Sequence, residues 1–167
     1  MRVLFTFAGG TGHAIPLVPI AGAVGVAGHT VAFAGSRSAA AALKTYGFTM
    51  FARPDEPKAE PNTMSKLLEL DMEHEYEVLR NYYADRLARE RADRVLDLGA
   101  EWQPDLIVCD EVDFGSMIAA ERLGLPHATV LVVASGSFVR PDVVAEPLDA
   151  LRAEHGLPAD PGLAMPG

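Results

Sequence analysis

The stretch MRVLFTFAGGTGH, residues 1–13, joins an apolar run to a glycine-rich turn that ends in a histidine. Residues 2–8 are apolar on both faces, as is typical of a buried parallel strand. Glycine-rich turns after a first strand usually bind a phosphate, and such turns end in glycine or lysine more often than in histidine. The stretch therefore predicts the first strand and turn of an α/β fold, with an unusual residue at the ligand-facing end.

Strand and helix patterns alternate along the rest of the chain. Strands are expected at residues 29–35, 48–54, 104–110 and 126–133, and helices at 16–27, 36–47, 63–102, 114–123 and 143–154. In the long helix the apolar stripe fades between Ala88 and Arg94, which predicts a kink or break there. The stretch at 54–62 is read as a surface loop, and the Pro/Gly-rich end at 156–167 carries no core signal. The alternation predicts one α/β domain: a doubly wound, mostly parallel Rossmann-like sheet with helices on both faces.

Composition excludes several classes of function. A net charge of -9 argues against a nucleic acid or an anionic membrane as the main partner, and 49% hydrophobic residues is a globular profile. Cys109 is the single cysteine, so an intrachain disulfide and a cysteine metal cluster are excluded. No histidines have metal-ligand spacing, and no run reaches the roughly 18–20 apolar residues that span a bilayer. We expect a soluble cytoplasmic protein with no structural metal and no stable membrane insertion; a homodimer stays open.

The turn at 9–13 does not fit either phosphate-binding fingerprint. Ile15 stands where a dinucleotide motif needs its third glycine, and no Walker A lysine follows. What remains is a tight turn in which Gly10, Thr11 and Gly12 let the backbone approach a ligand. His13 lies at a helix N-terminus, where the helix dipole disfavours an imidazolium, so we expect a neutral ring able to act as a general base. The alternative is a helix-capping or solvated histidine.

Asp110 is the second candidate, because it ends a buried strand at the same edge of the sheet. If that strand neighbours the first one, its carboxylate could reach the far ring nitrogen of His13, fix the tautomer and stabilise the imidazolium. The alternative is an aspartate that caps the helix beginning at Phe114. Glu111 and Asp113 lie close by and could take the place of Asp110.

Weaker candidates surround these two. Ser135 and Ser137 follow the last apolar strand and could hydrogen-bond a ligand, although Ser and Gly are ordinary in turns. Phe114 could line a pocket for an apolar ligand together with the tyrosines at 76, 82 and 83. At helical spacing, core packing explains at least half of these aromatic residues equally well.

The sequence also resembles a known family. The pattern GGTGH-AIPLVPIAGAV-GVAGHTVAFAG, followed by RPDEP and QPDLIVCDEVDFGSMIAAERLGLPHATV, resembles the GT-B glycosyltransferases that use nucleotide-activated sugars, in particular the antibiotic and macrolide branch. The resemblance covers roughly residues 1–135. It implies an inverting transfer from a UDP- or TDP-sugar to a hydroxyl of a hydrophobic polyketide- or macrolide-like aglycone, without a cofactor or metal. By motif match, His13 takes the base position and Asp110 the supporting carboxylate position.

Family members are more than twice as long as this chain. We therefore expect residues 1–167 to form the N-terminal acceptor-binding domain, without the donor-binding domain and inactive alone. The loop at 54–65, the helix after it and the segment at 135–145 would then shape the acceptor pocket. One alternative is a stand-alone nucleotide- or cofactor-binding module, although the missing third glycine and the absence of an acidic residue after the second strand weigh against NAD. Another is a non-catalytic auxiliary partner of a full-length transferase.

Overall fold

The computed structural model describes residues 1–52, 69, 71–132 and 139–160. Within them the chain forms a five-stranded parallel sheet in the order β3-β2-β1-β4-β5. The strands are β1 (Arg2–Thr6), β2 (Thr30–Gly35), β3 (Thr49–Ala52), β4 (Leu106–Asp110) and β5 (His127–Val130). Each overlaps a strand expected from the sequence, and the parallel pairing confirms the predicted α/β class.

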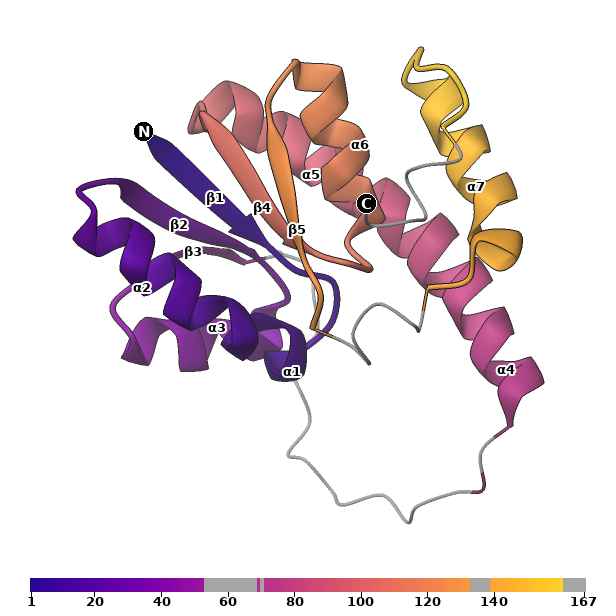
Figure 1. Ribbon diagram of the computed structural model, residues 1–167, viewed down its shortest axis with the longest axis horizontal. Helices are drawn as coiled ribbons and strands as arrows, with labels where there is room; N and C mark the ends of the chain where they lie inside the picture. Colours follow the sequence, from indigo (N-terminus) through magenta and orange to yellow (C-terminus); the bar gives the residue numbers. More distant parts are fainter. Residues whose placement is uncertain (53–68, 70, 133–138, 161–167) are drawn as a thin grey trace.

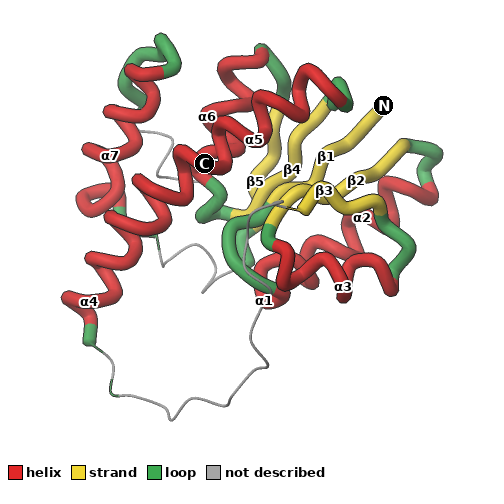
Figure 2. Tube along the Cα trace, turned by 180° about the vertical axis from the view of Figure 1, so that it is seen from behind, coloured by secondary structure: helices red, strands yellow, loops and turns green. Residues whose placement is uncertain are grey.

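Helices cover both faces of the sheet (Figures 1 and 2). One face packs against α1 (Thr11–Ala14), the 3₁₀ turn η1 (Ile15–Leu17), α2 (Val18–Val26) and α3 (Arg37–Thr45). The other packs against α5 (Ala88–Glu101) and α6 (Phe114–Leu123). The residues of β1 alternate between the two cores: Val3 and Phe5 face the first helix group, and Leu4 faces the second. Both faces of a central strand are thus apolar, as the run VLF predicts.

Helix α5 is the last part of one long continuous helix, and the earlier part of this helix packs with α7 beyond the sheet. That earlier part consists of α4 (Met72–Glu77) and the π-helical stretch η2 (Val78–Leu87), and α7 (Pro141–Glu154) lies alongside η2 in Figure 1. Leu79, Leu87, Phe114 and Leu148 are buried together in the cluster that joins these helices. The chain end contributes to the same cluster, because Leu157 packs against it and the Nε of Arg152 donates to the carbonyl of Pro158 at 2.6 Å. The expectation that nothing after Gly156 belongs to a core is therefore wrong for Leu157.

The predicted kink or break does not lie within residues 88–94. Helix α5 runs through this stretch without a break, and the departure from α-helical geometry comes earlier, in η2. The stripe only seems to fade in the sequence because a charged residue occupies it: Arg91 follows Leu87 by four residues, precedes Val95 by four, and is 2% exposed. The predicted loop at 54–62 lies outside the described residues.

Candidate active site

The candidate site lies where the connections of the sheet change direction. β1 and β4 are neighbours, with Thr6 opposite Cys109, while the chain leaves β1 toward β2 and leaves β4 toward β5. In open α/β sheets, ligands bind at the carboxyl ends of the strands beside such a point. The turn at 9–13 follows β1 and the stretch at 110–113 follows β4, so the two predicted loops do meet at one edge.

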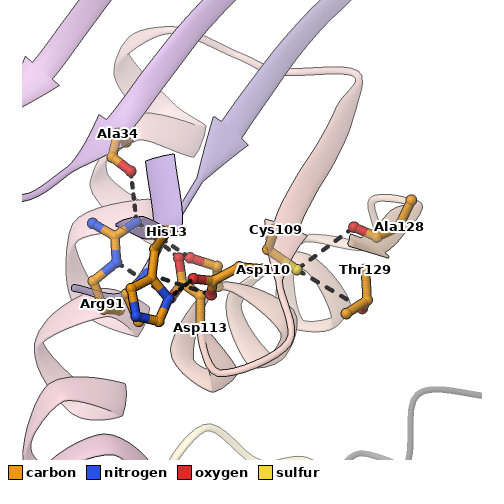
Figure 3. A network of polar contacts seen from close by, with 10 residues as sticks. His13, Ala34, Arg91, Cys109, Asp110, Asp113, Ala128 and Thr129 are labelled. Carbon is orange, nitrogen blue, oxygen red and sulfur yellow. Dashed lines mark hydrogen bonds and ion pairs between the residues drawn. The ribbon is translucent and has the colours of Figure 1, made fainter. Parts of the chain in front are cut away.

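His13 and Asp110 form a short hydrogen bond at this edge (Figure 3). The Nδ1 of His13 lies 2.6 Å from the Oδ2 of Asp110, and Asp110 is fully buried at the last position of β4. Its other oxygen accepts from the backbone N–H of Ala8 at 3.4 Å. A carboxylate can only accept here, so Nδ1 carries the proton and Nε2, on the far side of the ring, is the free acceptor. The predicted contact between these two side chains is confirmed.

The other two carboxylates of the stretch have different partners. The Oε2 of Glu111 accepts from the backbone N–H of Val132 at 2.7 Å. Asp113 receives two hydrogen bonds from Arg91, at 3.1 Å and 3.2 Å. The N-cap residue of α6 is Asp113, and its side chain makes no capping hydrogen bond. Asp110 lies three residues before this position, so it does not cap the helix. Of the three candidates, Asp110 is the residue that contacts His13.

Gly9 fixes the position of the imidazole and was missed by the sequence reasoning. Its φ is +110°, and a Cβ atom there would lie 2.7 Å from the Cδ2 and 3.0 Å from the Nε2 of His13. A Cβ on Gly10 would have only ordinary contact, 3.8 Å from the Oγ of Ser38, and one on Gly12 would meet nothing within 4 Å. The steric need for glycine therefore lies at Gly9, whereas Gly10 and Gly12 leave open backbone for a ligand.

The rest of the turn forms the first turn of α1. The carbonyl of Gly10 accepts from the N–H groups of His13 and Ala14, at 3.1 Å and 3.3 Å, which makes His13 the third residue of the helix. Thr11 and Gly12 are exposed. Their role as ligand contacts stays a prediction, as does that of Gly10.

The protonation of His13 differs from the sequence-based expectation. Its hydrogen bond to Asp110 raises the pKa of His13 above the ordinary value of 6.5, against an opposing effect of burial. The helix-dipole prediction of a ring biased toward the neutral form is wrong, because a full charge in contact outweighs the roughly half charge at a helix N-terminus. Burial in turn raises the pKa of Asp110 from 3.8 to about 6.

A cavity of about 230 Å³ adjoins this pair. Gly9, which touches the imidazole, is also part of its wall. The other described residues that line it come from β2, α3, η2, α5 and the turns after β1 and β2: Phe7, Gly10, Gly35, Ser36, Ser38, Tyr82, Leu87 and Arg91. A basic nitrogen and a concave surface therefore lie next to each other at the sheet edge.

Comparisons with known proteins find sugar transferases. The chain is 31% identical to the L-demethylnoviosyl transferase of Streptomyces niveus, over 95% of this chain and 42% of that protein. It is 28% identical to the aclacinomycin-T 2-deoxy-L-fucose transferase of Streptomyces galilaeus, over 78% and 36%. The solved structure of a glycosyltransferase from Streptomyces sp. SF2575 superposes with a TM-score of 0.72 at 22% identity, over 95% of this chain and 47% of that one.

The chain is a homologue of the antibiotic glycosyltransferases. The parallel sheet with its covering helices matches the GT-B fold of the glycosyltransferase structures. No family model matches the sequence. The chain spans about two fifths of the length of the curated relatives it matches, 42% and 36% for the two named above.

The aromatic residues of this glycosyltransferase homologue divide between site and core. The ring of Tyr83 lies 6.5 Å from that of His13, and Tyr82 packs edge-on against Tyr83 at 5.2 Å. The hydroxyl of Tyr76 accepts from Arg140 at 2.8 Å. Phe114 is 1% exposed within the cluster under α7, so its ring packs against the core here and presents no surface to a ligand. Ser135 and Ser137 lie outside the described residues.

Arg91 is the second residue that the sequence reasoning missed. Its position on the apolar stripe of α5, between Leu87 and Val95, was the available signal, since a lone arginine on a buried helix face needs a partner. Within the described ranges, no three histidine, cysteine or acidic side chains are grouped to hold a metal ion, and no helix has the length and apolar character to cross a membrane.

Proposed function

We propose that this chain is the acceptor-binding, base-supplying domain of an inverting glycosyltransferase. The enzyme would move a sugar from a UDP- or TDP-sugar to a hydroxyl of a natural-product aglycone. The observation that carries the proposal is the 2.6 Å hydrogen bond between the Nδ1 of His13 and the buried carboxylate of Asp110. The name of one relative, the aclacinomycin-T 2-deoxy-L-fucose transferase, includes an aclacinomycin as acceptor, which supports a natural-product aglycone here.

The chemistry follows from the tautomer of His13. With Nδ1–H donated to Asp110, Nε2 accepts the proton of the acceptor hydroxyl. The oxygen so activated attacks the anomeric carbon of the sugar, and the nucleoside diphosphate leaves with the electron pair of the broken C–O bond. A single displacement of this kind inverts the anomeric configuration.

Asp110 acts through His13. Once the ring has taken a proton it is an imidazolium, and the carboxylate in contact with Nδ1 stabilises that charge. The same interaction raises the pKa of His13, because it stabilises the protonated ring. A base of higher pKa takes the proton of an alcohol more readily, provided that it is neutral when the acceptor binds.

The test uses the whole protein of which this sequence is part, with its nucleotide-sugar. Replacing His13 with Ala is expected to lower kcat by about 10²- to 10⁴-fold, the usual contribution of a positioned base. His127→Ala is the matched control, because His127 is exposed at the start of β5, away from the carboxyl ends of the strands. Full activity in the His13 variant would contradict the base assignment. A product with the anomeric configuration of the donor, read from its NMR coupling constant, would contradict the inverting mechanism.

A further inference from the structure

Arg91 reaches from α5 to the sheet edge that carries the candidate site (Figure 3). Its Nε and Nη2 donate to the two carboxylate oxygens of Asp113, at 3.2 Å and 3.1 Å. Nη2 also donates to the carbonyl of Ala34 at 3.0 Å. Arg91 is 2% exposed and Asp113 is fully buried. A buried two-point bond between a guanidinium and a carboxylate fixes the orientation of both groups, so Asp113 is held toward α5.

The two partners of Arg91 lie on opposite sides of β1. Ala34 belongs to β2 and is paired with Thr6 of β1, whereas Asp113 follows β4, which is paired with β1 on the other side. Arg91 therefore links the segments that flank the end of β1. The turn that carries His13 leaves from this same end of the strand.

Three carboxylates at and after the end of β4 act on His13. Those of Asp110, Glu111 and Asp113 all raise its pKa, and the hydrogen bond to Asp110 makes the largest contribution. Glu111 is held by a backbone N–H of the chain leaving β5, and Asp113 is held by Arg91. The ring thus contacts one carboxylate of the stretch, because each of the other two has a partner of its own.

The remaining groups beside the ring carry little net charge. Tyr83 of η2 lies 6.5 Å from His13 between ring centres, and burial raises the pKa of this tyrosine above 10.0, so its hydroxyl is neutral. Arg91 stays protonated in a protein, and it contacts the carboxylate of Asp113. Two opposite charges in contact largely cancel at a third group, so the pair adds little field at the imidazole.

We propose that Arg91 is a positioning residue for the base: it holds Asp113 toward α5 and balances its charge, and it thereby leaves Asp110 as the one carboxylate of the stretch that contacts His13. The inference rests on the proposed function for the role of His13 in the reaction. Arg91 acts through Asp113 and not on the reacting atoms.

The test follows the ring of His13 by NMR pH titration in the 167-residue chain. Asp113→Asn keeps the shape of the side chain and an oxygen that accepts from Arg91, but it leaves the guanidinium charge unbalanced. We expect the pKa of His13 to fall by about 0.5–1 pH unit, because an unbalanced cation opposes the imidazolium. Adding Arg91→Met removes this cation, and we expect the pKa to return to that of the unsubstituted chain.

The double variant separates charge balance from packing. If Arg91 only filled space in the fold, its loss would leave the titration of the Asp113→Asn chain unchanged or move it further from the unsubstituted chain. Either result would overturn the proposal, as would an Asp113→Asn chain whose His13 titrates normally.

Two further variants serve as controls. Arg91→Lys keeps a cation beside Asp113 and loses the fixed planar geometry, so we expect a nearly unchanged His13 titration with a lower unfolding free energy. A shift as large as that of Asp113→Asn would contradict the balancing role. Glu101→Gln breaks the ion pair of Glu101 with Arg94, farther along α5, and should leave the titration of His13 unchanged. A shift equal to that of Asp113→Asn would show that any unbalanced arginine on α5 has this effect, against the proposal.

Kinetics of the whole protein with its nucleotide-sugar connect the titration to the reaction. The acid limb of kcat/KM should move to lower pH in Asp113→Asn and return in the double variant with Arg91→Met. A limb that stays in place while the NMR titration moves would refute the proposed base, and with it any role of Arg91 in the reaction. A titration that does not move would refute the role of Arg91 alone and leave the His13→Ala experiment untouched.

Discussion

A Cβ atom on Gly9 would lie 2.7 Å from the Cδ2 of His13, so the backbone of the turn and the imidazole occupy adjoining space with no room between them. Gly9→Ala must therefore displace the ring and also hold a φ of +110° with an L side chain. We expect a loss of unfolding free energy of about 1–3 kcal/mol, measured by urea denaturation. The NMR titration of His13 should move toward that of an unpaired histidine, because the displaced ring loses Asp110.

Gly12→Ala serves as the control for this effect. Gly12 has no positive φ, lies in α1, and offers open space to a methyl group. We expect its His13 titration to match the unsubstituted chain, and its unfolding free energy to be unchanged or up to about 1 kcal/mol higher, as for alanine at an open helical position. Equal destabilisation by the two substitutions would show that Gly9 has no special relationship with the imidazole.

Asp110→Asn is expected to lower the pKa of His13. The hydrogen bond to Asp110 is the largest contribution that raises this pKa, and an amide carries no charge to stabilise the imidazolium. The measurement is an NMR pH titration of the His13 ring in the 167-residue chain. In the whole enzyme, the acid limb of kcat/KM should move to lower pH in the variant. A limb that stays in place would assign it to another group.

The same substitution should change the pH dependence of stability. Both pKa values are higher in the folded chain than in the unfolded one, with His13 above 6.5 and Asp110 raised from 3.8 to about 6. The folded chain thus binds more protons, and the stability that these groups contribute is complete at low pH and falls as pH rises through the folded values. The stability difference between the unsubstituted chain and Asp110→Asn should therefore decrease from about pH 5 to about pH 8. An increase over this range would contradict the raised values.

Arg91→Met should destabilise the chain by about 3–5 kcal/mol, because it leaves the carboxylate of Asp113 buried without its partner. The double variant with Asp113→Leu removes both charges. We expect it to cost less than the sum of the two single substitutions by about 1–3 kcal/mol, measured in a double-mutant cycle by urea denaturation. Additive costs would mean that the two side chains do not depend on each other.

Gly115→Ala should strongly destabilise the contact between α5 and α6. A Cβ atom on Gly115 would lie 2.0 Å from the carbonyl oxygen of Ala88 and 2.7 Å from the backbone nitrogen of Ala92. Two helices would have to separate, at a cost of about 2–3 kcal/mol or more. Gly25→Ala, at an exposed helical glycine with free space, should instead stabilise the chain by about 0.5–1 kcal/mol. Thermal unfolding of both variants distinguishes the two outcomes.

The parts of the site that depend on strand order could be predicted from the sequence. His13 and Asp110 each follow a buried apolar strand, and parallel strands end at one edge, so the pattern places both residues at that edge. Their contact also needs β1 and β4 to be neighbours, which the structure shows and the sequence left as a condition. The special role of Gly9 could not be told from those of Gly10 and Gly12, because the sequence does not show which of these glycines has a positive φ. The role of Arg91 could not be predicted, because its partner Asp113 comes twenty-two residues later in the sequence. The pKa of His13 was predicted in the wrong direction because the contact with Asp110 had been weighed only as a possibility.

The stretch from Asp110 to Asp113 has a mechanical consequence. Its three carboxylates hold three separate parts of the molecule: Asp110 holds the turn after β1, Glu111 the chain leaving β5, and Asp113 helix α5. A displacement of residues 110–113 would strain the hydrogen bonds to all three parts at once, so this stretch couples their positions. Substitutions within this stretch would disturb all three parts together, so under the proposed function a change of acceptor specificity is expected to arise from substitutions elsewhere in the site.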